Sequence, residues 1–199
     1  MDKQEWMQEL KQKANQMQII LSDTKLEEFY QYMQLLQTWN EKMNLTAITD
    51  EKEILFKHFI DSLSILPYIE QANCILDVGT GAGFPGIPLK IVQEDKQITL
   101  LDALQKRITF LEEVIKTLGL SKIEAKHGRA EEFVKEKGQR EGYDVVTSRA
   151  VARLSVLLEY MLPFVKVGGL CVCMKSEKIT EELEEAKKAI ELLGGKIQR

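Results

Sequence analysis

The stretch from Ile75 to Ile91, ILDVGTGAGFPGIPLKI, constrains the fold of this chain more than any other part of it. A short apolar run is followed by glycines and then by apolar residues at helical spacing, a pattern that predicts a strand, a turn and a helix. Gly79, Gly81 and Gly83 permit positive φ angles and let the backbone approach a ligand without a Cβ in the way. Pro85 is expected to open the helix, since proline in a first turn loses an N–H that had no partner there. The stretch therefore predicts a ligand-binding turn.

The same glycines fit two cofactor motifs. Gly81, Gly83 and Gly86 spell G-x-G-x-x-G, the dinucleotide fingerprint, and Asp102 follows at the spacing of an acid that binds a ribose. The residues from Asp77 to Gly83 also spell D-x-G-x-G-x-G, the first motif of S-adenosylmethionine-dependent methyltransferases as a class. A carboxylate at the strand tip suits a ligand with an α-ammonium group and would repel a pyrophosphate against the same turn. We therefore favour S-adenosylmethionine as the cofactor. A plain βα turn whose glycines serve tight packing is the alternative.

Size and composition restrict the class of protein. The chain has 199 residues, of which 44% are hydrophobic and 29% charged, as in a globular protein, and no apolar run is long enough to span a bilayer. Its N-terminus is too polar for a secretory signal, so we expect a cytoplasmic protein without membrane contact. The net charge of -4 argues against a broadly basic nucleic-acid binder, so any such contact must use a local patch. The three cysteines and two histidines form no set with zinc-ligand spacing, and no metal site is predicted.

Residues 1–70 are predicted to form an N-terminal helical extension packed on the core, because they carry three amphipathic patterns. A capping box of Thr24 and Glu27 is expected to start the second helix, whose apolar and aromatic stripe we interpret as packing. The third helix is expected to begin at a cap on Asp50 and to end at Pro67.

Residues 71–199 alternate short apolar strands with helices and form the second predicted domain. Repeated βα units with apolar strands indicate an α/β fold with a parallel sheet covered on both faces. The strands are expected around Ile75, Ile98, Ile123, Tyr143 and Leu170. Ligands of such sheets bind outside the carboxyl ends of the strands, which places the site at that edge.

Five residues directly follow predicted strands and are expected to converge at this edge: Asp77, Asp102, Ala130, Glu131 and Arg149. Asp102 would accept hydrogen bonds from both ribose hydroxyls, although a helix cap is its alternative role. Ala130 and Glu131 would border an adenine. For Glu131, a favourable charge at a helix N-terminus is an equal alternative.

Three polar residues of the extension are further candidates. His58 and Asp61 are three apart and would share one helix face, where they either orient a ligand or make a surface hydrogen bond. Asn44 lies in a predicted loop, where asparagine commonly serves a turn.

The motif set NLTAI, KHFIDSL, ILDVGTGAGFPGIPLKI, LDALQKR, GRAEE and YDVVTSRAVARL resembles one family, from about Trp39 to Lys175. It is similar to the bacterial small-subunit ribosomal RNA guanine-N7 methyltransferases, once called glucose-inhibited division protein B. The resemblance implies a class I S-adenosylmethionine-dependent methyltransferase fold, Rossmann-like, with an N-terminal helical extension. It implies S-adenosylmethionine as cofactor and a guanine in the decoding-site loop of 16S rRNA as target.

The resemblance also implies site residues. Cofactor contacts would fall on Gly79, Phe84, Asp102, Ala130, Glu131 and Arg149. We expect Asn44, His58 and Asp61 to position the target guanine. The fold normally continues with a sixth and a seventh strand where this sequence ends, so we expect a C-terminally truncated domain that lacks those strands.

Guanine N7 carries an unshared electron pair and needs no general base, in keeping with the lack of a Ser-His-Asp or Cys-His arrangement. A local basic patch for RNA phosphates is predicted from Lys106, Arg107, Arg129 and Arg153, with Arg149 and Arg153 able to share one helix face. Ordinary solvated charges are the alternative, and an equal one for Lys106 and Arg107. The partner would be 16S rRNA or the small ribosomal subunit, and the chain a monomer. The alternatives are a small-molecule methyltransferase, a non-catalytic S-adenosylmethionine-binding or ribosome-binding module, and a nicotinamide dehydrogenase.

Overall fold

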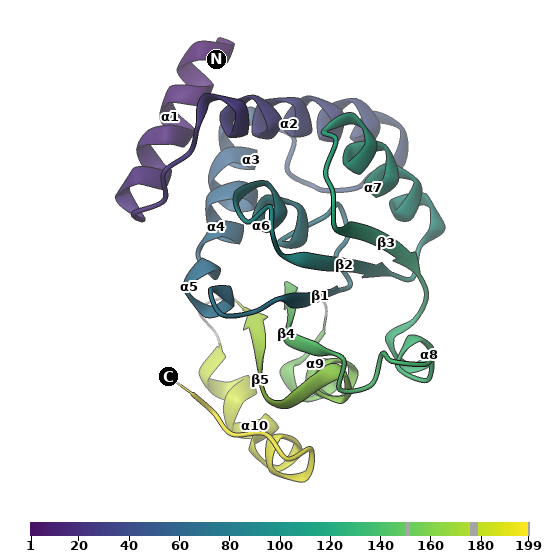
Figure 1. The fold of residues 1–199 in the computed structure, drawn as a ribbon. Helices are drawn as coiled ribbons and strands as arrows, with labels where there is room; N and C mark the ends of the chain where they lie inside the picture. Colours follow the sequence, from purple (N-terminus) through teal and green to yellow (C-terminus); the bar gives the residue numbers. More distant parts are fainter. Residues whose placement is uncertain (150–151, 176–178, 199) are drawn as a thin grey trace.

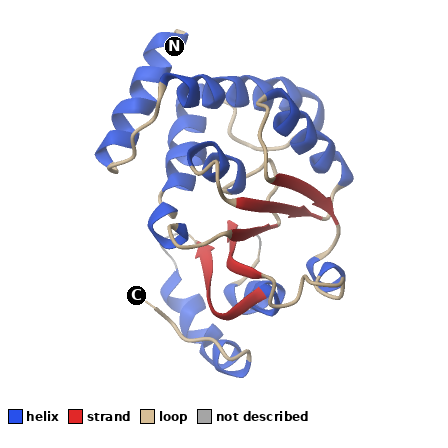
Figure 2. Ribbon diagram, viewed as in Figure 1, coloured by secondary structure: helices blue, strands red, loops and turns tan. Residues whose placement is uncertain are grey.

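The computed structural model describes residues 1–149, 152–175 and 179–198. Its N-terminal part is a group of helices, and its C-terminal part is a sheet with helices on both faces (Figures 1 and 2). The N-terminal helices are α1 (Lys3–Gln16), α2 (Asp23–Met43), α3 (Glu51–Ile54), the π-helical turn η1 (Leu55–Ile60), α4 (Asp61–Leu63) and α5 (Leu66–Ile69). The later helices are α6 (Gly86–Val92), α7 (Gln105–Thr117), α8 (Ala130–Phe133), α9 (Leu154–Met161), the 3-10 turn η2 (Leu162–Phe164) and α10 (Ile179–Leu192).

The sheet has the order β3-β2-β1-β4-β5, and every neighbouring pair is parallel. Its strands are β1 (Cys74–Val78), β2 (Gln97–Asp102), β3 (Ile123–His127), β4 (Tyr143–Arg149) and β5 (Val165–Met174). The central strand β1 places Ile75 opposite Ile98 of β2 and opposite Val145 of β4. The predicted parallel α/β architecture is therefore confirmed. The strand order reverses beside β1, which puts the expected ligand crevice at its carboxyl end.

Alternate residues of the strands enter two separate cores. Ile75, Ile98 and Leu100 face a core that they share with α1, α2, α6 and α7. Leu76 and Val146 face the opposite side and pack with α8 and α9. The N-terminal helices thus complete the hydrophobic core on one face of the sheet. Figure 1 shows α2 and α7 together on that side.

The start of α2 differs from the prediction. Ser22 is the N-cap, and its hydroxyl accepts a hydrogen bond from the N–H of Lys25 at 3.3 Å. The predicted capping box of Thr24 and Glu27 is wrong, because the helix already begins before Thr24. The carboxylate of Glu27 instead forms an ion pair with Lys3 of α1 at 2.7 Å.

The third helix begins as predicted, since the Asp50 carboxylate accepts a hydrogen bond from the N–H of Glu53 at 2.9 Å. It does not remain an α-helix, because its hydrogen-bond ladder widens into the π-helical turn η1 over Leu55–Ile60. Pro67 does not end this helix but lies in the first turn of α5, where a missing N–H costs nothing.

Asp144 joins the beginnings of two strands that are distant in sequence. One oxygen of its carboxylate accepts hydrogen bonds from the N–H groups of Asn73 and Cys74, both at 2.8 Å. The other oxygen pairs with the ammonium of Lys166 at 2.7 Å. These contacts fix the register of β4 against β1. Among the helices of the described residues, none is both long and apolar enough to cross a membrane.

Candidate functional site

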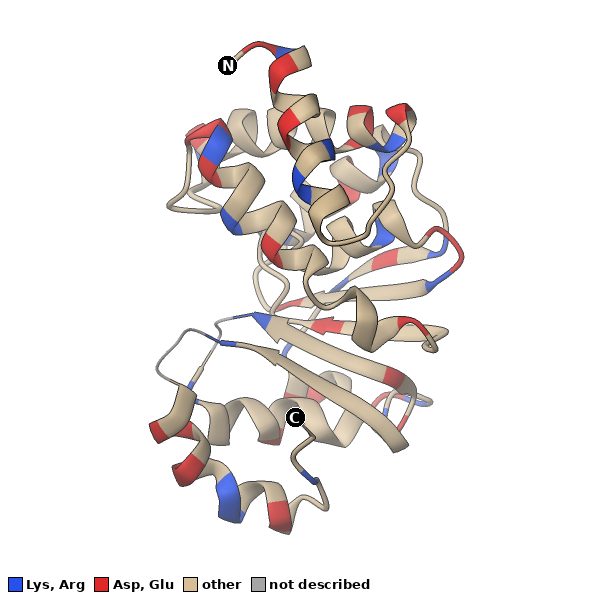
Figure 3. Ribbon diagram, turned by 90° about the vertical axis from the view of Figure 1, so that its left-hand side faces the viewer, with Lys and Arg blue, Asp and Glu red and all other residues tan. Residues whose placement is uncertain are grey.

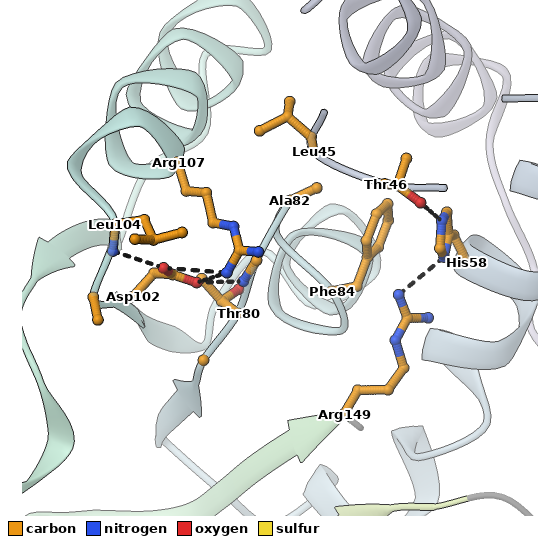
Figure 4. A pocket seen from close by; sticks show the side chains of 13 residues that line it. Leu45, Thr46, His58, Thr80, Ala82, Phe84, Asp102, Leu104, Arg107 and Arg149 are labelled. Carbon is orange, nitrogen blue, oxygen red and sulfur yellow. Dashed lines mark hydrogen bonds and ion pairs between the residues drawn. The ribbon is translucent and has the colours of Figure 1, made fainter. Parts of the chain in front are cut away.

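A pocket of about 430 Å³ opens at the carboxyl ends of β1, β2 and β4. Figure 4 shows the side chains of Asp102 and Arg107 on one side of it and those of Phe84, His58 and Arg149 on the other. Its lining consists of Leu45, Thr46, His58, Gly79, Thr80, Gly81, Ala82, Phe84, Asp102, Ala103, Leu104, Arg107 and Arg149. The volume lies within the range of about 300–1,000 Å³ that is usual for small-molecule sites.

The glycine turn after β1 forms one wall of the pocket. Gly79 and Gly81 have φ angles of 66° and 62° and line the pocket with bare backbone. Gly83, at φ 98°, does not line it, and a Cβ at this position would lie 2.7 Å from the hydroxyl of Tyr32. The structure therefore gives Gly83 a packing role, whereas Gly79 and Gly81 keep the close approach to a ligand.

Asp77 lies behind this turn rather than in the pocket. Its side chain is fully buried, and one carboxylate oxygen accepts hydrogen bonds from the Thr80 hydroxyl at 2.6 Å and from the N–H of Gly86 at 2.9 Å. The other oxygen has no hydrogen-bond partner among the described residues. Burial raises the pKa of Asp77 to about 6. In this position Asp77 braces the turn, so the expected direct contact with an ammonium group is not what the geometry supports.

Asp102 ends β2 with its carboxylate at the edge of the pocket. One oxygen accepts the N–H of Leu104 and the other the N–H of Gly81, both at 2.9 Å. The guanidinium of Arg107 pairs with the second oxygen at 3.1 Å. Two backbone donors thus orient Asp102, and an arginine neutralises its charge. Arg107, which we predicted as a surface contact for RNA, is instead part of the pocket lining.

Arg149 ends β4 and connects the sheet to the extension. Its guanidinium donates hydrogen bonds to the Lys57 carbonyl at 3.1 Å, to the Asp61 carboxylate at 3.2 Å and to Nδ1 of His58 at 2.9 Å. It also lies 4.9 Å above the ring of Phe84, a cation–π geometry. His58 and Asp61, which we predicted to share one helix face, both contact this guanidinium, His58 from η1 and Asp61 from the start of α4.

His58 is buried within η1 and stacks on Phe84, with ring centroids 4.4 Å apart. Burial and then the charge of Arg149 lower its pKa to about 4, so the imidazole is neutral near pH 7. π-helical turns are rare and frequently occur at functional sites. Here the turn brings a neutral imidazole and an arginine together at one end of the pocket.

Several predicted residues do not line this pocket. Asn44 is exposed and ends α2 in the left-handed conformation, a turn role. Asp61 reaches the site only through Arg149. Ala130 and Glu131 open α8 after β3, with Ala130 buried and the Glu131 side chain about half exposed. These two residues do not line the pocket; they follow β3, which pairs with β2.

Each of the four cations predicted to contact phosphates has a partner within the protein, and Arg107 pairs with Asp102. Lys106 donates a hydrogen bond to the Met43 carbonyl at 2.9 Å, whereas Arg129 lies 3.9 Å from Glu131 and Arg153 pairs with a glutamate of α10. Arg149 and Arg153 do not share a helix face, because one ends β4 and the other precedes α9. Figure 3 shows basic residues interspersed with acidic ones.

Three groups of the site were not predicted from the sequence. Leu45 and Thr46 line the pocket from the loop after α2, and the only signal for them was the NLTAI motif itself. Leu104 lines it beside Asp102. Tyr32 holds the glycine turn that lines the pocket, because its buried hydroxyl donates a hydrogen bond to the Ala82 carbonyl. Tyr32 is buried with the core residues of α2, and the predicted stripe of that helix contained Tyr30 in its place.

The chain is similar in sequence to one family over most of its length. The family model of rRNA small subunit methyltransferase G (GidB) matches residues 25–199. The ribosomal RNA small subunit methyltransferase G of Acetivibrio thermocellus is 55% identical over 179 residues, which cover 89% of this chain and 74% of that protein. The protein of the same name from Clostridium tetani is 50% identical over 187 residues, which cover 93% of this chain and 78% of that protein.

Among solved structures, a SAM-dependent methyltransferase from Aquifex aeolicus superposes with a TM-score of 0.55 at 20% sequence identity. The match covers 75% of this chain and 86% of that one. At this identity the likeness concerns the fold alone. The predicted class I, Rossmann-like methyltransferase fold is therefore confirmed.

Proposed function

We propose that this chain, which belongs to the rRNA small subunit methyltransferase G family, transfers a methyl group from S-adenosylmethionine to N7 of a guanine in the decoding-site loop of 16S rRNA. The recipient atom and the RNA loop rest on the family resemblance of the motifs. The observation that carries the proposal is the Asp102 carboxylate, held at the pocket edge beside the bare backbone of Gly79 and Gly81.

The residues of the pocket fit S-adenosylmethionine. The Asp102 carboxylate offers acceptors for the two ribose hydroxyls, and the glycine turn leaves room for the amino-acid half of the cofactor. Arg149 supplies a cation for the amino-acid carboxylate. Ala130 and Glu131 would border the adenine from beyond Asp102. When bound, the cofactor supplies an electrophilic methyl group on its sulfonium.

The chemistry requires orientation of the base and no proton removal. Guanine N7 attacks through an electron pair in the ring plane, so the enzyme needs no general base. The neutral state of His58 agrees with a positioning role, since an imidazolium would repel a base that becomes cationic on methylation. Correct alignment of the reacting atoms can contribute about 7–11 kcal/mol of barrier lowering. We assign the target guanine to the end of the pocket lined by Thr46, His58 and Phe84.

The deciding experiment is transfer of labelled methyl from S-adenosylmethionine to small ribosomal subunits and to bare 16S rRNA. We expect label in 7-methylguanine after nucleoside digestion, and an Asp102→Ala variant with greatly weakened cofactor binding. Label on another atom would refute the N7 assignment. Cofactor binding without transfer to either RNA would refute the rRNA proposal in favour of a small-molecule or binding role.

A nicotinamide dehydrogenase is separated from this proposal by melting temperature. A ligand that binds only the native state stabilises it by RT ln(1 + [L]/Kd), so binding raises the melting temperature. We expect S-adenosylmethionine to raise the melting temperature and NAD to leave it unchanged. The reverse result would overturn the cofactor assignment.

A further inference from the structure

Thr46 is held more rigidly than its place in a loop would suggest. It follows α2 by three residues and lines the pocket. The side-chain amide of Asn40 makes two hydrogen bonds to its backbone, accepting its N–H at 2.8 Å and donating to its carbonyl at 2.9 Å. Loop backbone that is paired in this way presents its side chain in a fixed direction. Figure 4 shows this side chain beside His58, at the end of the pocket away from Asp102.

The proton positions around Thr46 follow from the hydrogen-bond network. Nδ1 of His58 must accept, because its partner at 2.9 Å is Arg149 and a guanidinium has only donors. A neutral imidazole then carries its proton on Nε2, which lies 2.9 Å from the Thr46 hydroxyl oxygen. The Thr46 oxygen therefore accepts from His58, and it also accepts from the N–H of Ile48 at 3.1 Å.

These two bonds use both lone pairs of the Thr46 oxygen, so its own hydrogen must be donated elsewhere. None of the described residues accepts it, and the residue lines the pocket. Arg149, His58 and Thr46 thus form a directional chain that ends in a hydroxyl donor available to a ligand. The chain cannot reverse, because its first member cannot accept a hydrogen bond.

We propose that the Thr46 hydroxyl donates a hydrogen bond to O6 of the target guanine and so selects guanine over adenine. This inference rests on the proposed function, which puts guanine N7 at this end of the pocket. N7 and O6 lie on the same edge of guanine and are both acceptors, whereas adenine presents an amino donor in place of O6. A fixed hydroxyl donor pairs with O6 and opposes the adenine amino group. Selection would therefore not depend on the reacting atom, which both purines share.

The experiment is a double-mutant-type cycle that combines variants of the enzyme with analogues of the target base. Wild type, Thr46→Val and Thr46→Ser are assayed on RNA that carries guanine, 2-aminopurine without O6, or inosine without the 2-amino group at the target position. We expect kcat/KM of wild type to fall about 10–100-fold from guanine to 2-aminopurine. Thr46→Val should lose a similar factor on guanine and lose little more on 2-aminopurine. Thr46→Ser should restore the discrimination, and inosine should behave like guanine with respect to Thr46.

Two outcomes would overturn the assignment while leaving the proposed function intact. Equal losses by Thr46→Val on guanine and on 2-aminopurine would show that the hydroxyl does not contact O6. A Kd for S-adenosylmethionine raised by the full factor of the kcat/KM loss would assign the donor to the cofactor carboxylate instead. If Thr46→Val does not fold, the substrate series on wild type and Thr46→Ser still tests the inference. Equal kcat/KM of wild type on guanine and on 2-aminopurine would refute it. Failure of wild type to methylate guanine N7 at all would refute the proposed function itself.

Discussion

Replacing Asp77 by asparagine should change how the free energy of unfolding depends on pH. The carboxyl group is fully buried, and burial raises its pKa from 3.8 to about 6. Between these values the native state holds a proton that the unfolded state releases, so stability falls as pH rises through this window. The full cost, about 3 kcal/mol, is present above pH 6. Asparagine removes this cost because it does not titrate.

His58 contributes with the opposite sign over nearly the same window. Burial and the charge of Arg149 lower its pKa from 6.5 to about 4, so the native state excludes a proton that the unfolded state binds. This contribution, also about 3 kcal/mol, is lost as pH falls through the window. In wild type the contributions of Asp77 and His58 largely cancel. Asp77→Asn should therefore reveal a stability that rises with pH.

The assay is urea unfolding of wild type and Asp77→Asn at steps from pH 4 to pH 8. We expect the variant to gain about 3 kcal/mol relative to wild type across this range, whatever constant offset its new amide introduces. Asp144→Asn is the matched control. Burial favours a higher pKa for Asp144, but hydrogen bonds from Lys166, Cys74 and Asn73 outweigh it and lower the pKa below its ordinary value of 3.8. Its contribution to stability therefore changes only below about pH 4, and the difference between Asp144→Asn and wild type should stay nearly constant from pH 4 to pH 8. A difference between Asp77→Asn and wild type that does not vary with pH would refute the reasoning.

Three further predictions concern the pocket. Arg107→Met should bind S-adenosylmethionine up to about tenfold more tightly, because the ribose hydroxyls no longer compete with a guanidinium for the Asp102 carboxylate. Calorimetry measures this affinity, and weaker binding by the variant would contradict the prediction. Gly83→Ala should lower the free energy of unfolding in urea by about 1–3 kcal/mol more than Gly119→Ala does. Both glycines have positive φ, but only the Cβ added at Gly83 meets close neighbours. Equal losses would show that this steric overlap has no effect. Affinity for 16S rRNA should fall steeply with salt, and Lys106→Gln should make the logarithmic slope shallower by about 0.7–0.9, whereas an unchanged slope would remove this residue from the phosphate contacts.

The parts of the site that the sequence predicted are those encoded by local signals. Asp102 and Arg149 follow apolar strands directly, and parallel strands bring their carboxyl ends to one edge. Gly79 and Gly81 sit in a turn that requires positive φ, which few residues other than glycine adopt. In these cases the residue type and its position relative to a strand were sufficient.

The parts that were missed depend on contacts between distant segments. Tyr32 reaches a carbonyl 50 residues away, and Thr46 meets His58 12 residues away across a π-helical turn that no spacing rule predicts. Asp77 was correctly placed at a strand tip, but its direction depends on Gly86, which leaves room for the carboxylate behind the turn. Side-chain direction of this kind follows from packing rather than from sequence period.

The strand order of the sheet has a consequence for synthesis of the chain on the ribosome. Ile75 of β1 meets Ile98 of β2 23 residues later, but its partner on the other edge, Val145 of β4, follows only after 70 residues. At about 5–20 residues per second, that second edge stays unpaired for about 4–14 s. A translation pause between β2 and β4 should therefore lower the yield of folded protein more than an equal pause after β5, measured by proteolysis of the nascent chains. During synthesis this protein thus exposes a strand edge that the finished molecule conceals in the middle of its sheet.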